Sequence, residues 1–244
     1  MRADVPFGHP HFGMMFECEC LSDEKKRRQF EDLQRFSNLD QFRDKSFKGF
    51  DGRIRGADKA LAEAKKFARD PRGWLVLVGG VGRGKTHLAA AIANEVLAGG
   101  SPCLFTVVPE LLDHLRSTFA PGSDIRYDEL FEQVKIVPLL VLDDLGTENA
   151  TPWAEEKLYQ IINYRYNNCL PTVITTNRSL GSIDPRIASR MQDHSLAVVV
   201  IIEGDDYRVQ GEKQSSQRDY IPTAAPKTPR ATARKPNSFR PPIK

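Results

Sequence analysis

The chain has 244 residues, of which 40% are hydrophobic and 27% are charged, a composition typical of a globular protein. Its longest uninterrupted apolar run, residues 196–202, is too short to cross a bilayer, so a membrane-spanning protein is excluded. The N-terminus does not resemble a secretory signal, and four cysteines are too few for a disulfide scaffold, so we expect a cytoplasmic protein.

The net charge of +3 is unevenly distributed along the chain. Residues 211–244 contain eight Lys or Arg and two acids, which gives this segment +6 and leaves −3 for the remainder. The same segment has six prolines and little apolar periodicity, so it buries too little surface to offset its ordering entropy. We predict a disordered basic tail, and the acidic remainder argues against a protein that coats nucleic acid uniformly.

Three parts are predicted: a small N-terminal extension over residues 1–45, an α/β domain over residues 46–210 and the tail over residues 211–244. In the extension, Phe30, Leu33 and Phe36 recur at a spacing of three and predict a helix over residues 21–42. This apolar stripe packs either on the α/β domain or on a partner. The basic run at residues 25–28 and the basic tail each have two interpretations. They are either solvated charge or a weak contact with phosphate backbones.

Short apolar runs alternate with longer amphipathic segments in the α/β domain. The apolar runs predict buried strands over residues 74–78, 102–108, 139–142, 172–176 and 197–202. The amphipathic segments predict helices over residues 56–70, 86–97, 110–119, 124–134 and 154–166. The alternation predicts a parallel five-stranded sheet with helices on both faces, whose ligands bind at the carboxyl ends of the strands.

A glycine-rich turn between the first predicted strand and the next helix matches the phosphate-binding pattern GxxxxGK[ST]. Glycines let successive backbone N–H groups surround a phosphate, and the helix N-terminus adds a positive dipole. Lys85 would reach the β- and γ-phosphates of ATP, and the Thr86 hydroxyl would bind Mg²⁺. The predicted nucleotide-binding residues are Gly79, Gly80, Val81, Gly82, Arg83, Gly84, Lys85, Thr86 and His87.

Two acids follow the apolar run at residues 139–142. A carboxylate at a strand end beside a phosphate loop can hold the Mg²⁺ shell, which assigns this role to Asp143. Asp144 then occupies the place of a general base that polarises the attacking water. Because many ATPases of this type carry Glu there, and Asp is one methylene shorter, we expect hydrolysis that is slow or dependent on a partner.

Asn177 ends the run TVITT. The long separation between Lys85 and Asp143 leaves room for another strand between theirs in the sheet, and the run before Asn177 fits that middle place. A polar residue there can orient water or sense the γ-phosphate.

The sequence resembles the DnaC/IstB-like branch of the AAA+ ATPases over about residues 50–208. The motifs that carry the resemblance are GGVGRGKTHLAAAIANE, LLVLDDLGTE, VITTN, RIASRMQD and GDDYR. The resemblance implies a P-loop NTPase fold of AAA+ type, with Arg190 as the arginine finger toward a neighbouring subunit and Arg208 as a second sensor of the nucleotide. Arg186 competes with Arg190 for the finger role. A finger between subunits implies ATP-dependent assembly into a ring or spiral.

The N-terminal extension carries a candidate zinc site at Cys18 and Cys20, with His9 and His11 as further ligands. Relatives in this family often carry a CxxC slightly upstream of a similar stretch. This chain begins without one, so either the start is truncated or the site is vestigial.

The leading functional interpretation is an ATP- and Mg²⁺-dependent AAA+ ATPase that acts in DNA replication and loads a hexameric helicase onto single-stranded DNA. A transposition helper ATPase that binds DNA and contacts a transposase is the nearest alternative. A nucleotide-switched adaptor with little hydrolysis belongs to another class. A small-molecule P-loop kinase is disfavoured by Asn177, Arg190 and Arg208.

Overall fold

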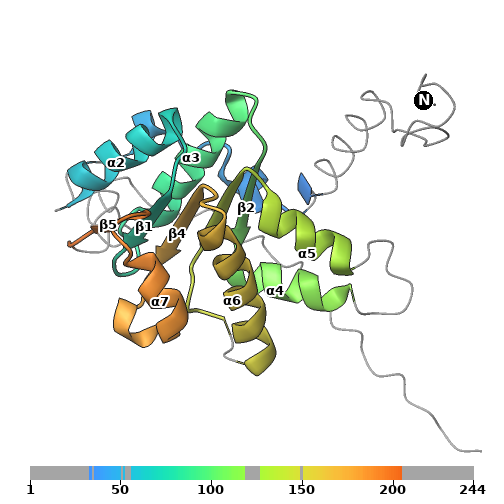
Figure 1. Ribbon diagram of the computed structural model, residues 1–244. Coiled ribbons are helices and arrows are strands. Elements are labelled where there is room, and N and C mark those ends of the chain that lie inside the picture. The colour runs from blue at the N-terminus through green and yellow to red at the C-terminus, as the bar shows by residue number, and fades with distance from the viewer. Residues whose placement is uncertain are drawn as a thin grey trace, which may run out of the picture.

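A computed structural model describes residues 33–34, 36–50, 52, 56–118, 127–148 and 151–204 of the chain. Within them, five parallel strands form one sheet in the order β2-β3-β4-β1-β5, and helices cover both of its faces (Figure 1). The strands are β1 (Trp74–Val78), β2 (Cys103–Val107), β3 (Leu139–Asp143), β4 (Thr172–Thr176) and β5 (Ala197–Ile201). The α-helices are α2 (Ala57–Arg69), α3 (Lys85–Ala98), α4 (Val108–Ser117), α5 (Tyr127–Ile136), α6 (Pro152–Asn167) and α7 (Pro185–Met191). The predicted five-stranded parallel α/β sheet is confirmed.

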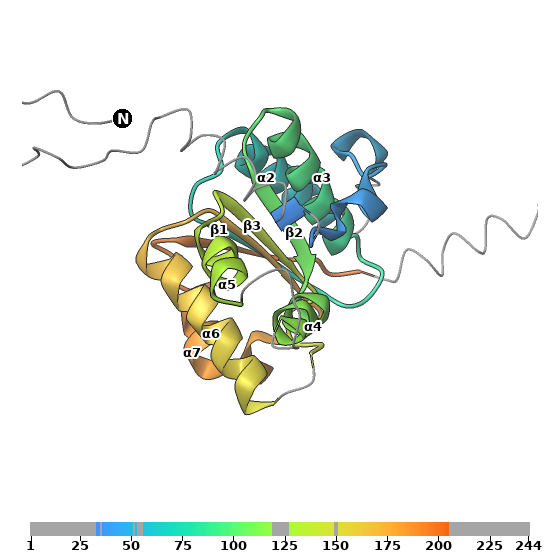
Figure 2. The ribbon, with the colours of Figure 1, turned by 90° about the vertical axis from the view of Figure 1, so that its right-hand side faces the viewer.

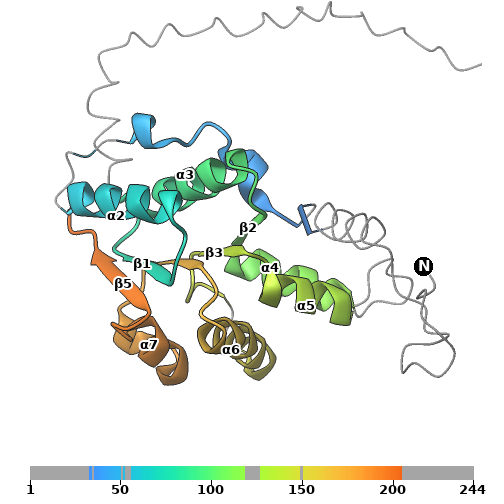
Figure 3. The same ribbon diagram turned by 45° about the horizontal axis from the view of Figure 1, so that its top comes forward.

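The sheet separates two apolar cores, because side chains alternate along each strand. Trp74 and Val76 face a core shared with α4, α5, α6 and α7. Leu75 and Leu77 face the opposite core, which is shared with α2 and α3. Figure 3 shows α2 and α3 on one side of the strands and α6 and α7 on the other. Burial on both faces explains why the strands are continuous apolar runs in the sequence.

The strand order places β4 between β3 and β1. Val78 at the end of β1 is in register with Thr176 at the end of β4. Leu142 of β3 is in register with Ile174 of β4. The expectation that the strand before Asn177 lies between the other two is therefore confirmed, and three strands end side by side.

Helix α7 has no counterpart among the predicted elements. Asp184 caps it by accepting from the backbone N–H groups of Arg186 and Ile187, and Pro185 stands in its first turn. A capping Asp followed by Pro is a start signal that the sequence contained, but seven residues are too few to show a helical period.

The N-terminal extension differs from the predicted helix over residues 21–42. Residues 33–34 are helical, but the chain then turns, and a 3-10 helix, η1 (Asn38–Phe42), begins after Ser37. The Ser37 side chain accepts from the N–H of Leu39 and caps this short helix. The prediction of one helix through residue 42 is therefore wrong at its C-terminal end, and residues 21–32 lie outside the described part.

The described part of the extension, residues 33–34 and 36–45, lies along the outer edge of β2 and beside α3 (Figure 2). Its polar side chains bond to alternate residues of that edge: Gln34 donates to the Cys103 carbonyl (2.7 Å), Ser37 donates to the Phe105 carbonyl (3.2 Å), and Asn38 accepts from the Val107 N–H (3.1 Å). Leu33 is buried in the core below, and Phe36 packs against it. This part of the apolar stripe thus packs on the α/β domain, while Phe30 lies outside the described residues.

A second 3-10 helix, η2 (Phe47–Gly49), follows in the N-terminal part, and a third, η3 (Leu180–Ser182), precedes α7. None of the helices in the described ranges combines the length and apolar character needed to cross a membrane. The predicted basic tail lies beyond residue 204, where the description ends.

Candidate functional site

The glycine-rich turn joins β1 to α3 as the sequence predicts. Gly82 and Gly84 have φ of 70° and 81°, a left-handed backbone that favours glycine. Gly84 is also the N-cap of α3, and a glycine offers no side chain to bond the first amides of the helix. The turn therefore presents backbone N–H groups and a helix N-terminus to an anion, which is the geometry of a phosphate site.

Lys85 is the first residue of α3, directly after this turn, and is only 5% exposed. Its Nζ donates to the Gly80 carbonyl over 2.8 Å, so the ammonium group is held inside the loop. Val81 stands at the tip of the loop and is 62% exposed. The buried cation and the open rim fit an anionic ligand that enters from solvent.

Asp143 ends β3 and is buried, with 2% of its surface exposed. Burial raises the pKa of its carboxyl group, and the neighbouring Asp144 raises it further. Hydrogen bonds from the Thr175 and Thr86 side chains and the charge of Lys85 act in the opposite direction. Asp143, Thr86 and Lys85, predicted separately from two motifs, are therefore brought together.

Thr175 is a residue of this site that the sequence analysis missed. Its hydroxyl donates to Asp143 Oδ1 over 2.6 Å and accepts from the Asp144 N–H over 2.9 Å. Thr175 is fully buried on β4, so it fixes both acids relative to the middle strand. The motif VITTN contains it, but a Thr within a strand is common for its β-propensity alone and so gives no signal of a site.

Asp144 has a left-handed backbone, with φ of 57°. A non-glycine residue in this region costs about 1 kcal/mol or slightly more. Its carbonyl accepts from the Thr147 hydroxyl over 2.7 Å, and the next residue, Leu145, donates its N–H to the Thr175 carbonyl over 2.9 Å. The turn is thus held by β4, and the half-buried Asp144 stands directly beside the carboxylate of Asp143.

Asn177 directly follows β4 and is exposed. The preceding Thr176 is buried and donates its hydroxyl to the Leu145 carbonyl over 2.7 Å. The segment that carries Asn177 is therefore tied to the turn that carries Asp144. Both residues lie at the same carboxyl edge of the sheet as the phosphate loop.

His87 faces away from the loop, toward the N-terminal segment. Its Nε2 lies 2.8 Å from the Ser46 carbonyl oxygen, and its ring meets the Phe50 ring edge-on, with 5.4 Å between the ring centroids. A Cβ on Gly84 would lie 2.6 Å from the Phe50 ring. The start of α3 is thus covered by residues 46–50, and the role of His87 in nucleotide binding stays a prediction.

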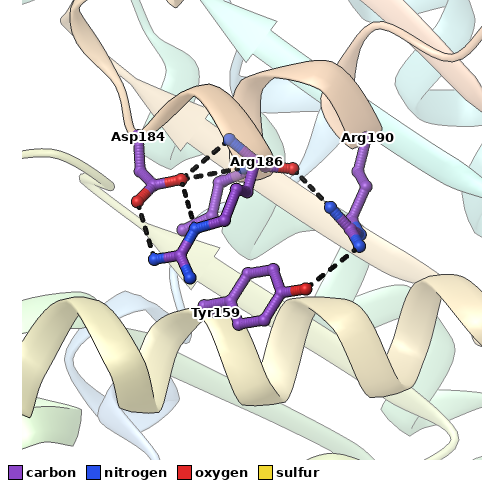
Figure 4. A network of polar contacts seen from close by, with 5 residues as sticks. Tyr159, Asp184, Arg186 and Arg190 are labelled. Carbon is purple, nitrogen blue, oxygen red and sulfur yellow. Dashed lines mark hydrogen bonds and ion pairs between the residues drawn. The ribbon is translucent and has the colours of Figure 1, made fainter.

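Arg190 lies on α7 with its side chain against α6 (Figure 4). It donates to Asn163 Oδ1 over 2.6 Å and to the Tyr159 hydroxyl over 3.4 Å, and its Nε is buried without a hydrogen-bond partner. Arg186, one turn earlier, is exposed, pairs with Asp184 and stacks on the Tyr159 ring at 4.2 Å. Both arginines are therefore engaged within the protomer, and the finger role of Arg190 stays a prediction.

Two sets of predicted site residues lie outside the described part of the chain. They are Arg208, and Cys18 and Cys20 with His9 and His11. Among the described residues, no group of three or more His, Cys, Asp or Glu could hold a metal ion. Mg²⁺ does not require such a cage, because it is usually held by one or two carboxylates together with substrate phosphates. Asp143 and Thr86 fit that donor set.

Comparison with known proteins agrees with this geometry. The family model described as IstB-like ATP binding protein matches residues 10–215. The replicative helicase loader DnaC of Escherichia coli (strain K12) is 28% identical over 169 residues, which cover 67% of this chain and 69% of that protein. The phage-like element PBSX protein XkdC of Bacillus subtilis (strain 168) is 28% identical over 213 residues, which cover 79% and 76%.

Solved structures show the same likeness. The crystal structure of the DnaC helicase loader superposes with a TM-score of 0.59 at 27% identity and covers 67% of this chain and 99% of that one. A structure of the replication initiator DnaA, bound to AMPPCP and single-stranded DNA, has a TM-score of 0.59 at 21% identity and covers 71% and 55%. The second likeness concerns the fold alone.

Proposed function

The chain belongs to the IstB-like ATP binding protein family, within the DnaC/IstB-like AAA+ ATPases, and from this premise we propose that it binds and hydrolyses ATP to load a replicative helicase onto single-stranded DNA. The observation that carries the proposal is the convergence of Lys85, Thr86 and Asp143 beneath one phosphate loop. Its relative DnaC is a replicative helicase loader by name, which supports the loader role.

Each residue of the site has a role that follows from its chemistry. Backbone N–H groups of the loop and the Lys85 ammonium bind phosphate oxygens. Thr86 and Asp143 would hold Mg²⁺, which neutralises phosphate charge when bound. Asp144 orients the attacking water and takes up its proton, and Asn177 orients the same water from the middle strand.

Residues outside one protomer's phosphate loop complete the proposed reaction. Arg190 would stabilise the developing charge in a neighbouring subunit, and Arg208 would do so from its own chain. This arrangement requires ATP-dependent self-association of cytoplasmic protomers into a ring or spiral. The shorter Asp144, in place of Glu, makes the reaction slow until DNA or the helicase adjusts the site.

A transposition helper ATPase is the second candidate. The matching family model is named for IstB, which keeps this alternative in view. The two candidates share the ATP site and differ in the protein partner, so they are separated by binding rather than by hydrolysis.

The proposal predicts slow ATP turnover that rises with single-stranded DNA or with a hexameric replicative helicase. Steady-state phosphate release measures it, and capture of the purified helicase measures partner binding. We expect Lys85→Ala and Asp144→Asn to lose about 100-fold or more in turnover, because charge stabilisation and proton transfer are removed. Lys59→Ala, at an exposed lysine of α2, is the matched control and should be unchanged.

Two outcomes would contradict the assignment. Turnover that Asp144→Asn leaves unchanged would remove the general base. If single-stranded DNA did not change the rate of ATP hydrolysis and the protein captured no helicase, the loader role would be rejected. The transposition helper or the nucleotide-switched adaptor would then be favoured.

A further inference from the structure

Arg83 belongs to the phosphate loop, but its side chain leads away from it toward the edge strand β5. Its Nη1 donates to the Ile202 carbonyl over 3.0 Å. Ile202 directly follows β5, is fully buried and donates its own N–H to the Val78 carbonyl over 2.8 Å. Residue 202 is thus bonded both to the strand that enters the loop and to the loop itself.

The two glycines at the start of the loop accommodate this contact. A Cβ on Gly79 would lie 2.6 Å from the Ile202 carbonyl oxygen and 3.5 Å from Arg83 Cδ. A Cβ on Gly80 would lie 3.0 Å from Arg83 Cζ and 3.2 Å from its Nε. Neither glycine is among the described residues with positive φ, so close approach, rather than backbone conformation, requires a glycine at these positions.

Lys85 holds the same short stretch of backbone through the Gly80 carbonyl. Phosphate would compete with that carbonyl for the Lys85 ammonium, because Lys85 is the residue that binds phosphate in this kind of loop. The Arg83 contact needs no such exchange, since its acceptor lies outside the loop. Arg83 can therefore keep the loop in place while Lys85 changes partner.

We propose that Arg83 is a positioning residue that braces the phosphate loop against residue 202 and couples nucleotide binding to the chain just after β5. The inference rests on the proposed nucleotide-binding function. A planar guanidinium suits this role because it can lie flat on the Gly80 backbone and donate to a carbonyl at the same time. Coupling is reciprocal, so a nucleotide in the loop stabilises the segment at residues 202–204, and that segment strengthens nucleotide binding.

Arg83→Met and Arg83→Lys test the brace, with the exposed Arg72→Met as a matched control. The measurements are the Kd of a fluorescent ATP analogue with Mg²⁺, the KM and kcat of ATP hydrolysis, and amide hydrogen exchange of the peptide containing Glu203 and Gly204. Exchange in α6 reports whether each variant remains folded.

We expect Arg83→Met to raise Kd and KM by about 5- to 20-fold and to leave kcat within about threefold. In the wild-type protein, nucleotide slows exchange at residues 203–204, and in Arg83→Met this slowing is lost while α6 stays protected. Arg83→Lys recovers only part of the affinity, because an ammonium group cannot both cover Gly80 and reach Ile202 as a planar fork does. Arg72→Met behaves as the wild-type protein.

Three outcomes would overturn the brace. Arg83→Met could keep the wild-type Kd and the nucleotide-dependent slowing. Arg83→Lys could recover the affinity completely, which would show that charge alone is responsible. If the folded wild-type protein bound no nucleotide, the proposed function would fail together with the inference, whereas normal binding by the wild type beside an unaffected variant rejects the brace alone.

Discussion

Asp143 is a single residue whose buried carboxyl group lowers the stability of the fold. Its folded-state pKa is raised above the ordinary value of 3.8, chiefly by burial, so the folded protein binds a proton more readily than the unfolded chain. As pH rises from the unfolded pKa through the folded one, the unfolded chain releases its proton first, and folding stability is lost. The charged form of the carboxylate is therefore less favourable in the fold than the protonated form, although Lys85 offsets part of this cost.

Asp143→Asn should consequently stabilise the nucleotide-free protein while abolishing hydrolysis. The amide removes the buried charge and can still accept from Thr175, so we expect a gain of about 0.5–2 kcal/mol at neutral pH. Thermal unfolding measures it, and the difference from the wild-type protein should shrink as the pH falls toward acid. Asp113→Asn, at an exposed carboxylate of α4, should stay within about 0.5 kcal/mol. A destabilised Asp143→Asn protein would show that its carboxylate is needed for folding.

Among the contacts between elements, Arg165 of α6 joins two stretches of chain at the amino ends of β3 and β4. It is fully buried on α6 and donates to backbone carbonyls around β3 and β4. Its acceptors are the carbonyls of Lys135, Val137, Pro138 and Pro171 and the hydroxyl of Thr172. Burial lowers its pKa to about 9, so the group is still charged at neutral pH.

Arg165→Met should destabilise the protein by about 3–5 kcal/mol, because several buried carbonyls lose their donor together. Arg165→Lys should be intermediate, since an ammonium has three donors and cannot span the same acceptors. Denaturant unfolding measures both, and Arg43→Met, at an exposed arginine, provides the control. A loss below about 1 kcal/mol in Arg165→Met would mean that water replaces the guanidinium.

The elements also show what the sequence can and cannot predict. The hydrophobic period of a helix and the apolar run of a buried strand are set by residues close together in the chain. The five strands, five helices and the phosphate loop were therefore predictable to within a few residues. Arg165 was not, because a charged residue on a helix is usually exposed and only the tertiary contacts reveal its carbonyl partners. The prediction of one helix through residue 42 was wrong for a similar reason. Gln34 and Asn38 form hydrogen bonds with the edge of β2, which lies about 70 positions away in the chain.

The proposed arginine finger makes one protomer complete the ATP site of another. Arg190 is held against α6 in the protomer, with its Nε buried and without a hydrogen-bond partner. A buried donor without an acceptor costs about 1–3 kcal/mol, which favours a second arrangement in which the guanidinium meets an anion. The phosphate loop of a neighbouring protomer can supply that anion in a head-to-tail assembly.

Subunit mixing tests this arrangement directly. Arg190→Ala keeps its own phosphate loop and Lys85→Ala keeps its own Arg190, so each alone should lose about 10³-fold in turnover. In an equimolar mixture, some interfaces place the intact loop of an Arg190→Ala subunit against the intact Arg190 of a Lys85→Ala subunit. ATPase activity should reappear in proportion to the fraction of such interfaces. A mixture of Lys85→Ala with the variant that carries both Lys85→Ala and Arg190→Ala lacks such contacts and should stay inactive. Tyr159→Phe, which removes only a hydroxyl acceptor at 3.4 Å, separates a packing effect from the loss of charge.

An Arg190→Ala protein that assembled and hydrolysed ATP normally, or a mixture that regained no activity, would place the arginine finger elsewhere, with Arg186 as the next residue to substitute.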